Sequence, residues 1–322
     1  MKGVFDMKIG VLTSGGDAPG MNAAIRAVVR AGEYYGHEVY GIKNGYGGLV
    51  DDDMILLDHK SVSGMLSRGG TFLGTTRLPE FHELETRKKA VENLKKRGIE
   101  ALITIGGDGT YRGAMALSKL GIKTIGLPGT IDNDIAGTDY TIGFATAVET
   151  IVDAIDKLRD TSSSHRRVSI IEVMGRRCGD LAVHAGICGG AEFIITPENP
   201  VDKQTMIQAI KRYKEEVRRH AVVVVTENIF DVHELANEIS TLSGFSSRAT
   251  VLGYIQRGGS PCPDDRILAS RMGEYAIELL TENIYGVCVG VRDNRMTHLS
   301  FANIVGQVRP KSQLYSLVKK VS

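Results

Sequence analysis

The stretch Pro128-Gly129-Thr130-Ile131-Asp132-Asn133-Asp134 places two carboxylates and an amide at three consecutive positions, directly after the apolar run 124–127. Proline and glycine end this run, which predicts a strand followed by a tight loop. In open α/β sheets, ligands bind at the strand ends where such loops begin. Acids in such a loop suit proton abstraction and metal–phosphate chemistry. The alternative is that Asp132 and Asp134 only cap turns.

A second acidic loop lies shortly before the first. Residues Ile105-Gly106-Gly107-Asp108-Gly109-Thr110 again follow an apolar run, with glycines around one acid. A carboxylate flanked by glycines can hold Mg²⁺ while the bare backbone lies against a triphosphate. A tight turn with a solvated Asp108 is the alternative. Two such loops after neighbouring strands would form one phosphate-handling site.

The hydrophobic pattern along the chain alternates between strands and helices. We expect strands at 8–12, 37–42, 101–105, 122–127, 168–173 and 221–226, and helices at 21–34, 83–96, 146–158 and 204–216. This alternation predicts βαβ units with parallel strands. The expected fold is α/β, with two similar doubly wound domains, mainly parallel sheets and helices on both faces.

Composition narrows the class of protein. The chain has 322 residues, 42% apolar and 24% charged, with a formal net charge of +1. That balance gives no electrostatic reason to expect nucleic acid or an anionic membrane as partner. No run is long enough to span a bilayer, and we expect a cytoplasmic protein. The four cysteines form no CxxC pair, so free thiols are expected. Either Met1 or Met7 could be the native start.

Glycines and basic residues supply further candidates for anion binding. The loop 13–22, with Gly15, Gly16 and Gly20, leads into a helix, whose N-terminus favours anions; a purely structural strand-to-helix turn is as good an explanation. Arginines near strand edges and glycine turns suit phosphate binding and charge neutralisation. They are Arg77, Arg166, Arg167, Arg176, Arg177, Arg248 and Arg257. For Arg166 and Arg177 we favour surface ion pairs.

Five motifs in this order resemble the bacterial ATP-dependent 6-phosphofructokinases. They are Leu12–Asn22, Gly106–Gly109, Pro128–Asp134, Met174–Arg176 and Gln256–Ser260. The resemblance extends from about Met7 to near Arg292. It implies Mg·ATP-dependent phosphorylation of the 1-hydroxyl of fructose 6-phosphate by a cytoplasmic homotetramer. It also implies an ATP-binding domain at 1–142 plus 255–305 and a sugar-phosphate-binding domain at 143–254 plus 306–322.

The resemblance also implies roles for individual residues. Asp132 matches the catalytic base, with Thr130, Arg176 and Asp134 as the other catalytic residues, and Asp108 matches the magnesium site. The ATP contacts are Gly16, Arg77, Leu78, Gly107, Asp108, Gly109 and Thr110. The sugar-phosphate contacts are Thr130, Ile131, Asp132, Arg167, Met174, Gly175, Arg176, Glu227, Arg248, Tyr254, Ile255, Gln256 and Arg257, with Arg167 and Arg248 reaching the 6-phosphate from a neighbouring subunit.

Two glycines bear on the phosphoryl donor. Relatives that use pyrophosphate tend to carry Asp and Lys at the positions of Gly109 and Gly129, and glycine there is associated with ATP. The expected reason is space, because a side chain at either position would fill the place of the nucleotide's α-phosphate.

Three departures from the family pattern stand out. Tyr254 replaces the usual His and carries no positive charge at neutral pH, so we expect weaker sugar-phosphate affinity. His59 and Gly64 stand where an effector site often has Arg and Asp, and Glu216 where a basic residue is common. The rest of that effector site for ADP or phosphoenolpyruvate is Arg26, Arg30, Arg159, Gly190, Ala191, Glu192 and Arg218. We expect a muted allosteric response.

Three other functions remain as alternatives. A pyrophosphate-dependent sugar-phosphate kinase is the nearest. NAD and lipid kinases share the stretch 106–110 but not the other motifs. A non-catalytic regulatory subunit should have eroded motifs, whereas the acids are intact here.

Overall fold

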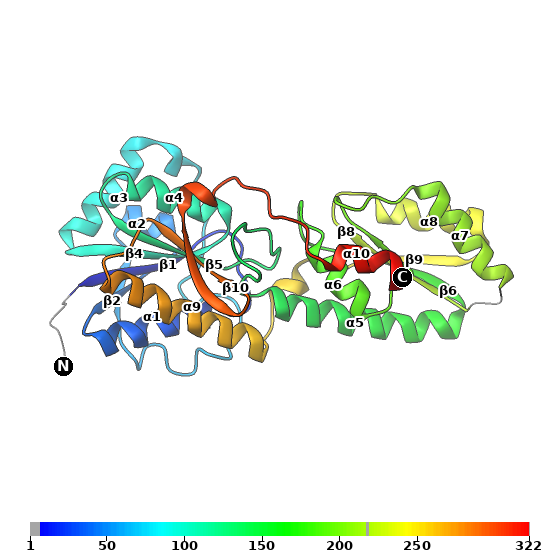
Figure 1. Cartoon of the computed structure of the whole chain (residues 1–322), viewed down its shortest axis with the longest axis horizontal. Coiled ribbons are helices and arrows are strands. Elements are labelled where there is room, and N and C mark those ends of the chain that lie inside the picture. Colours follow the sequence, from blue (N-terminus) through cyan, green and yellow to red (C-terminus); the bar gives the residue numbers. More distant parts are fainter. Residues whose placement is uncertain (1–6, 217–218, 322) are drawn as a thin grey trace. The chain divides into compact units, whose positions relative to one another are not determined.

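The computed structural model describes residues 7–216 and 219–321, which form two compact units (Figure 1). The first unit contains the chain up to Ile131, together with Ile135–Ala145 and Arg257–Arg309. The second contains Asp132–Asp134, Thr146–Gln256 and the chain from Pro310. The backbone therefore passes between the units more than once, and the acidic triplet groups with the second unit.

A seven-stranded sheet forms the centre of the first unit, as far as the chain is described. Its strands are β1 (Lys8–Thr13), β2 (Glu38–Ile42), β3 (Met54–Leu57), β4 (Ile99–Gly106), β5 (Lys123–Pro128), β10 (Val287–Arg292) and β11 (Arg295–Ser300). Their spatial order is β11-β10-β5-β4-β1-β2-β3, with antiparallel pairing only at the two outer strands. β4 and β5 are almost wholly buried, which explains their continuous apolar runs.

Helices cover both faces of this sheet. They are α1 (Met21–Tyr35), α2 (Tyr46–Asp51), α3 (Leu84–Lys96), α4 (Asp108–Ser118) and α9 (Pro263–Thr281), with the short 3₁₀ turns η1 (Pro79–His82) and η3 (Phe301–Asn303). Figure 1 shows α1 and α9 together on one side of the sheet, and α3 and α4 on the other. This doubly wound arrangement leaves the carboxyl ends of β1, β4 and β5 for loops.

The second unit contains a four-stranded parallel sheet within the described residues, in the order β7-β8-β6-β9. Its strands are β6 (Arg167–Val173), β7 (Phe193–Ile195), β8 (Ala221–Thr226) and β9 (Ser246–Val251). Its helices are α5 (Phe144–His165, which begins in the first unit), α6 (Asp180–Cys188), α7 (Lys203–Glu215), α8 (Val232–Ser243) and α10 (Leu314–Val321), with the 3₁₀ turn η2 (Gly253–Arg257). An apolar core of β6, β8, α7 and α8 holds this unit together.

The expected α/β class, mostly parallel sheets and helices on both faces are confirmed, and each predicted strand and helix is present. Two predictions differ in extent. α5 continues to His165, well past the predicted end at 158, and the hydroxyl of Ser162 in this extension contacts that of Ser169 at 2.5 Å. α4 begins at Asp108, inside the predicted loop. Within the described ranges, no helix is both long and apolar enough to cross a bilayer.

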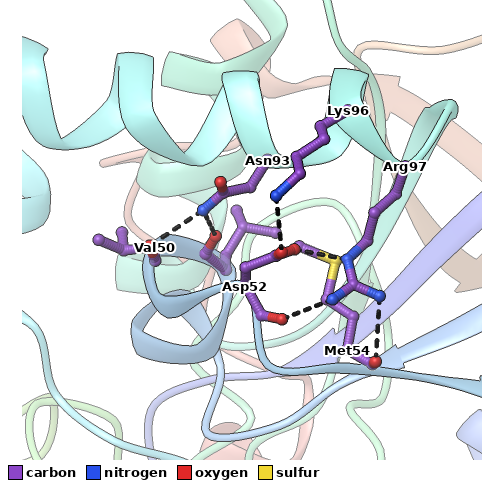
Figure 2. Close-up of polar contacts among 7 residues, drawn as sticks. Val50, Asp52, Met54, Asn93, Lys96 and Arg97 are labelled. Atoms are coloured by element: carbon purple, nitrogen blue, oxygen red, sulfur yellow. Dashed lines mark hydrogen bonds and ion pairs between the residues drawn. The ribbon is translucent and has the colours of Figure 1, made fainter.

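A polar cluster fastens the end of α3 to the turn after α2 (Figure 2). Arg97 donates from Nε to Asp52 Oδ1 at 2.5 Å and from Nη2 to the Asp52 carbonyl at 2.8 Å. Asn93 donates to the carbonyls of Leu49 and Val50. The Arg97 hydrogen bond holds the pKa of the Asp52 carboxyl below its usual range. These contacts close the last turn of α2, where Asp52 is left-handed with φ 61°.

Candidate active site

The first glycine loop and the second acidic loop contact each other in the first unit. The hydroxyl of Thr110 donates to the carbonyl of Ser14 at 3.0 Å, and the Ser14 amide donates to Ile105 at 3.0 Å. A Cβ on Gly106 would lie 2.3 Å from the Thr110 hydroxyl, so this contact requires glycine. The loops after β1 and β4 thus contact each other directly.

The second acidic loop is a helix N-terminus. Gly107 is the N-cap of α4, and Asp108 is the first helical residue. The free amides and the dipole at such an end favour an anion. An ideal Cβ on Gly109 would meet no atom within 4 Å, so Gly109 borders open space. That observation agrees with the expected requirement for room beside this glycine.

Gly129 lies against the packed core of the first unit. A Cβ there would lie 2.9 Å from Ile105 Cγ2 and 3.1 Å from Met21 Cε, both buried apolar side chains. A Cβ at Gly129 would therefore point into the core, and packing is a second reason for glycine at this position. The expectation that a longer side chain there would occupy the nucleotide's space stays a prediction.

The carboxylate of Asp108 is already oriented by its neighbours. Oδ2 accepts from Arg112 Nε at 2.8 Å, and Oδ1 accepts from the Gly306 amide at 2.8 Å. Among the described residues, no three His, Cys, Asp or Glu side chains gather as a metal site. Mg²⁺ that arrives on phosphates needs only one or two carboxylates, and a carboxylate has about four acceptor positions. The donor set around Asp108 therefore fits Mg²⁺ bound mainly by phosphate oxygens.

The two acidic loops leave neighbouring strands, as predicted. β4 and β5 are parallel, and Gly106 pairs with Pro128. The Gly129 amide donates to the Gly106 carbonyl at 3.1 Å, and a Cβ on Gly107 would lie 4.0 Å from Thr130 Cβ. Thr130 is held in turn by Thr141, whose hydroxyl donates to its carbonyl at 2.6 Å. Thr130 is thus a close neighbour of the α4 N-terminus within the first unit.

The remaining acids belong to a cluster in the second unit. Arg176 Nε lies 3.3 Å from Asp132 Oδ2, and the Arg176 amide donates to Glu227 Oε1 at 2.9 Å. The Met174 amide donates to Gln256 Oε1 at 3.1 Å. The structure therefore brings together five of the predicted residues, Asp132, Met174, Arg176, Glu227 and Gln256.

The Gly175–Arg176 turn has an unusual backbone that its neighbours enforce. Gly175 has φ 136° and Arg176 has φ 55°, a left-handed value that few non-glycine residues adopt. A Cβ on Gly175 would lie 2.3 Å from the Cys178 carbonyl. Such conformations persist where surrounding contacts over-determine them, and they cluster at functional sites.

Four other predicted residues differ in exposure. Ile131 is 3% exposed, so its side chain belongs to the core and only its backbone is available to a ligand. Tyr254 and Ile255, in η2, are 78% and 61% exposed. Asp134 is partly buried.

Arg167 and Arg248 are not brought to the Met174–Arg176 turn in a single chain. Arg167 begins β6, whereas Met174 follows the carboxyl end of that strand. Seven steps of about 3.3 Å each separate the two by about 23 Å. Arg248, in β9, pairs with Ser169 in the same amino-terminal half of β6. This separation agrees with the implied action of both arginines on a neighbouring subunit's substrate.

Arg257 lies in the first unit, next to Gly16, one of the residues predicted to contact ATP. Its Nη2 atom is 2.5 Å from Asp17 Oδ1, and a Cβ on Gly16 would lie 2.9 Å from the same atom. The segment with Arg77 and Leu78 also borders this loop, because Thr75 donates to the Gly15 carbonyl at 2.8 Å. Asp17 was not among the predicted site residues, although it stands within the first loop.

The predicted effector residues form two groups. Arg26 and Arg30, one turn apart on α1, line a cavity of about 530 Å³ with Arg271 of α9, and burial and Arg30 lower the pKa of Arg26. In the second unit, Arg159 donates to the carbonyls of Gly189 and Gly190. There Ala191 is buried, and Glu192 accepts from the Val222 amide at 2.7 Å. Arg218 lies outside the described residues.

Two buried polar residues near the acids were not among the predicted site residues. Asn133 is fully buried and donates from Nδ2 to Asp180 Oδ2 at 2.9 Å. The only signal for Asn133 was its place between two acids. Asp180 is a lone acid before an apolar helix, and no local pattern connects it with residue 133.

Glycine turns at helix N-termini, next to carboxylates at the carboxyl ends of parallel strands, define a phosphate-binding α/β protein. A family model described as phosphofructokinase matches residues 8–280. The chain is 60% identical over 291 residues to an ATP-dependent 6-phosphofructokinase of Erwinia tasmaniensis, covering 90% of this chain and 91% of the relative. It is 55% identical over 316 residues to one of Aliivibrio fischeri, covering 98% and 99%. The chain belongs to the phosphofructokinase family.

Solved structures have the same fold. A phosphofructokinase structure from Saccharomyces cerevisiae matches with a TM-score of 0.85 and 34% identity. The match covers 98% of this chain but 46% of the yeast chain, so this chain spans less than half the length of that relative.

Proposed function

We propose that this chain transfers a phosphoryl group from Mg·ATP to the 1-hydroxyl of fructose 6-phosphate, giving ADP and fructose 1,6-bisphosphate, as a glycolytic enzyme of the cytoplasm. The printed activity of the bacterial relatives supports the reaction. The single observation that carries it is the pair between Asp132 of the acidic loop and Arg176 of the turn anchored by Glu227. This pair joins a buried carboxylate to an exposed guanidinium.

Each catalytic residue has a role that its geometry suits. Asp132 accepts the proton of the attacking 1-hydroxyl. Arg176, whose side chain is 62% exposed, stabilises the charge that develops on the transferring phosphoryl oxygens. The hydroxyl of Thr130 donates to the same oxygens, and Asp134 orients a neighbouring cation. In phosphoryl transfer most of the acceleration comes from such positioning and electrostatics.

The nucleotide binds to the first unit in this proposal. The amides at the start of α4 bind its phosphates, and Gly109 leaves the room they need. Gly16, Arg77, Leu78 and Thr110 complete the site. Asp108 would hold Mg²⁺ on the phosphates, and the bound ion would offset negative charge on the reacting group. The domain limits proposed for ATP are 1–142 plus 255–305.

The sugar phosphate binds to the domain proposed at 143–254 plus 306–322. Met174, Gly175, Glu227 and the Ile131 backbone would contact the sugar, and Tyr254, Ile255 and Gln256 its phosphate. Arg257 would reach the same phosphate only by leaving Asp17, with which it pairs in the first unit. Arg167 and Arg248 come from a neighbouring subunit of a homotetramer. Mixing Arg167→Ala subunits with Asp132→Asn subunits tests this sharing: hybrid tetramers with restored activity support it, and a mixture no more active than its components contradicts it.

We also propose a muted allosteric response. Arg26, Arg30, Arg159, Gly190, Ala191, Glu192 and Arg218 keep part of a site for ADP or phosphoenolpyruvate, but His59, Gly64 and Glu216 remove its usual charges. His59 is further engaged by Glu33, whose Oε1 accepts from its amide at 2.9 Å. A strongly sigmoidal fructose 6-phosphate curve, shifted by either effector at low millimolar concentration, would refute this.

A coupled assay of the purified chain with fructose 6-phosphate tests the function. We expect turnover with Mg·ATP and none above background with Mg·pyrophosphate. Turnover only with pyrophosphate would indicate the alternative donor. Binding of the sugar phosphate without turnover on either donor would indicate a regulatory subunit.

A further inference from the structure

The acidic loop is built around a buried asparagine. Asn133 is fully buried, and Asp132 beside it is 4% exposed. Asn133 has φ 52°, a left-handed conformation that asparagine tolerates better than most residues. Because a left-handed residue reverses the chain sharply, the conformation of Asn133 decides where the carboxylates on either side of it point.

Asp180 holds that asparagine. The Asn133 Nδ2 atom donates to Asp180 Oδ2 at 2.9 Å, and both side chains are buried. The Asn133 carbonyl accepts from Cys178 Sγ at 3.8 Å. The loop is thus fixed through its side chain and its main chain, by residues that precede or open α6. A hydrogen bond to a charged acceptor is stronger than one between neutral groups.

The start of α6 is itself fixed. The Gly179 amide donates to both carboxylate oxygens of Glu198, at 3.0 and 3.2 Å. A Cβ on Gly179 would lie 2.3 Å from Thr196 Cβ, so the two segments touch closely. Lys311, in the carboxyl-terminal segment, donates to the Glu198 carbonyl at 2.7 Å. Asp180 therefore presents its carboxylate from a rigid base.

We propose that Asp180 is a positioning residue that acts through Asn133 on the general base Asp132. By accepting the Asn133 amide, it keeps the left-handed turn and directs the Asp132 carboxylate toward Arg176 and the substrate hydroxyl. This inference rests on the proposed function. Displacement of a reacting group by about 1 Å can cost about 10²-fold in rate, so the contact matters for turnover more than for substrate binding.

The test is kinetic and uses a conservative pair. Asp180→Ala removes the acceptor, and we expect kcat to fall about 10–100-fold while both KM values change little. Asp180→Asn keeps one acceptor oxygen for the Asn133 amide, and it should recover most of the lost kcat. A general loss of folded enzyme would instead lower the active fraction of both variants, which active-site titration measures.

The decisive comparison repeats Asp180→Ala in an Asp132→Asn background. If Asp180 acts through the base, the substitution costs nothing further there, because residues that act as a unit are not additive. Asn133→Gly removes the donor while tolerating the left-handed backbone, and it should lose the same factor as Asp180→Ala. If Asp180→Ala does not fold, the kcat of Asn133→Gly tests the proposal in its place.

Three outcomes overturn the inference while the function stands: wild-type kcat in both Asp180→Ala and Asn133→Gly, an equal further loss in the Asp132→Asn background, or no rescue by Asp180→Asn. A wild-type chain without turnover on ATP or pyrophosphate removes the proposed function, and this inference with it.

Discussion

The Nε atom of Arg176 lies 3.3 Å from the Oδ2 atom of Asp132, and the two side chains differ sharply in exposure, at 62% and 5%. Water reaches the Arg176 guanidinium and screens its attraction to the carboxylate. The guanidinium can therefore leave the carboxylate for a phosphoryl group without unfolding the loop. In the proposed mechanism the buried carboxylate takes the proton while the exposed guanidinium turns to the phosphoryl group.

The first prediction concerns the base. Asp132→Asn keeps the shape of the side chain but removes its ability to take a proton. We expect kcat to fall about 10²–10⁴-fold, the usual contribution of general base catalysis, with both KM values nearly unchanged. Steady-state kinetics measure this. Asp153→Asn, which breaks an exposed pair with Lys157, is the control and should keep full activity. Normal turnover of Asp132→Asn would end the assignment.

A second prediction concerns the two glycines at 109 and 129, of which the first borders open space and the second packs against the core. Gly109→Ala adds a methyl group in open space at the start of α4, so stability should be unchanged or rise by about 0.4–1 kcal/mol while KM for ATP rises. Gly129→Ala drives a methyl group against Ile105 and should cost about 1–3 kcal/mol of stability. Thermal unfolding and ATP titrations distinguish the two. The reverse pattern would contradict both explanations.

A third prediction concerns the missing histidine. Tyr254→His restores a group that can carry positive charge next to a sugar phosphate. We expect a lower KM for fructose 6-phosphate, with a larger effect at pH 6 than at pH 8, because the imidazole is charged below about pH 6.5. Tyr254→Phe, which adds no charge, is the control. An unchanged or higher KM in the histidine variant counts against the idea.

A fourth prediction concerns the carboxyl of Glu172, which feels the charge of Glu227. Burial, then the charge of Glu227, raises the pKa of Glu172, with Asp231 also raising it and His233 lowering it. A raised folded-state pKa means that ionised Glu172 costs stability above the unfolded pKa of about 4.3. Glu172→Gln should therefore raise Tm at pH 8, and the gain should vanish near pH 4. A gain that is the same at both pH values would refute this cause.

Much of the first unit was predictable because its strands are buried on both faces. β4 and β5 read as continuous apolar runs closed by glycine or proline, so their positions and the loops after them followed from the sequence. β9 did not, because Ser246, Arg248 and Thr250 give it no apolar run. The sequence did not predict that α4 begins at Asp108, because Gly109, a poor helix former, occupies the first turn of this helix.

The candidate site was predictable in its residue types but not in its connections. The acids and arginines carry their chemistry in short motifs, whereas the contact between Asn133 and Asp180 joins residues 47 positions apart. The packing around Gly129 could not be predicted either, because only the folded chain brings Ile105 and Met21 against it. Packing of distant segments decides such details.

The most direct test of the account is a crystal structure of this protein with fructose 6-phosphate and Mg²⁺ bound to a non-hydrolysable ATP analogue. We predict nucleotide phosphates on the amides at the start of α4, Mg²⁺ next to Asp108, and the sugar 1-hydroxyl about 2.6–3.2 Å from the Asp132 carboxylate. The central claim would be contradicted by a nucleotide bound away from both Gly107 and Thr130, or by a 1-hydroxyl out of reach of the Asp132 carboxylate.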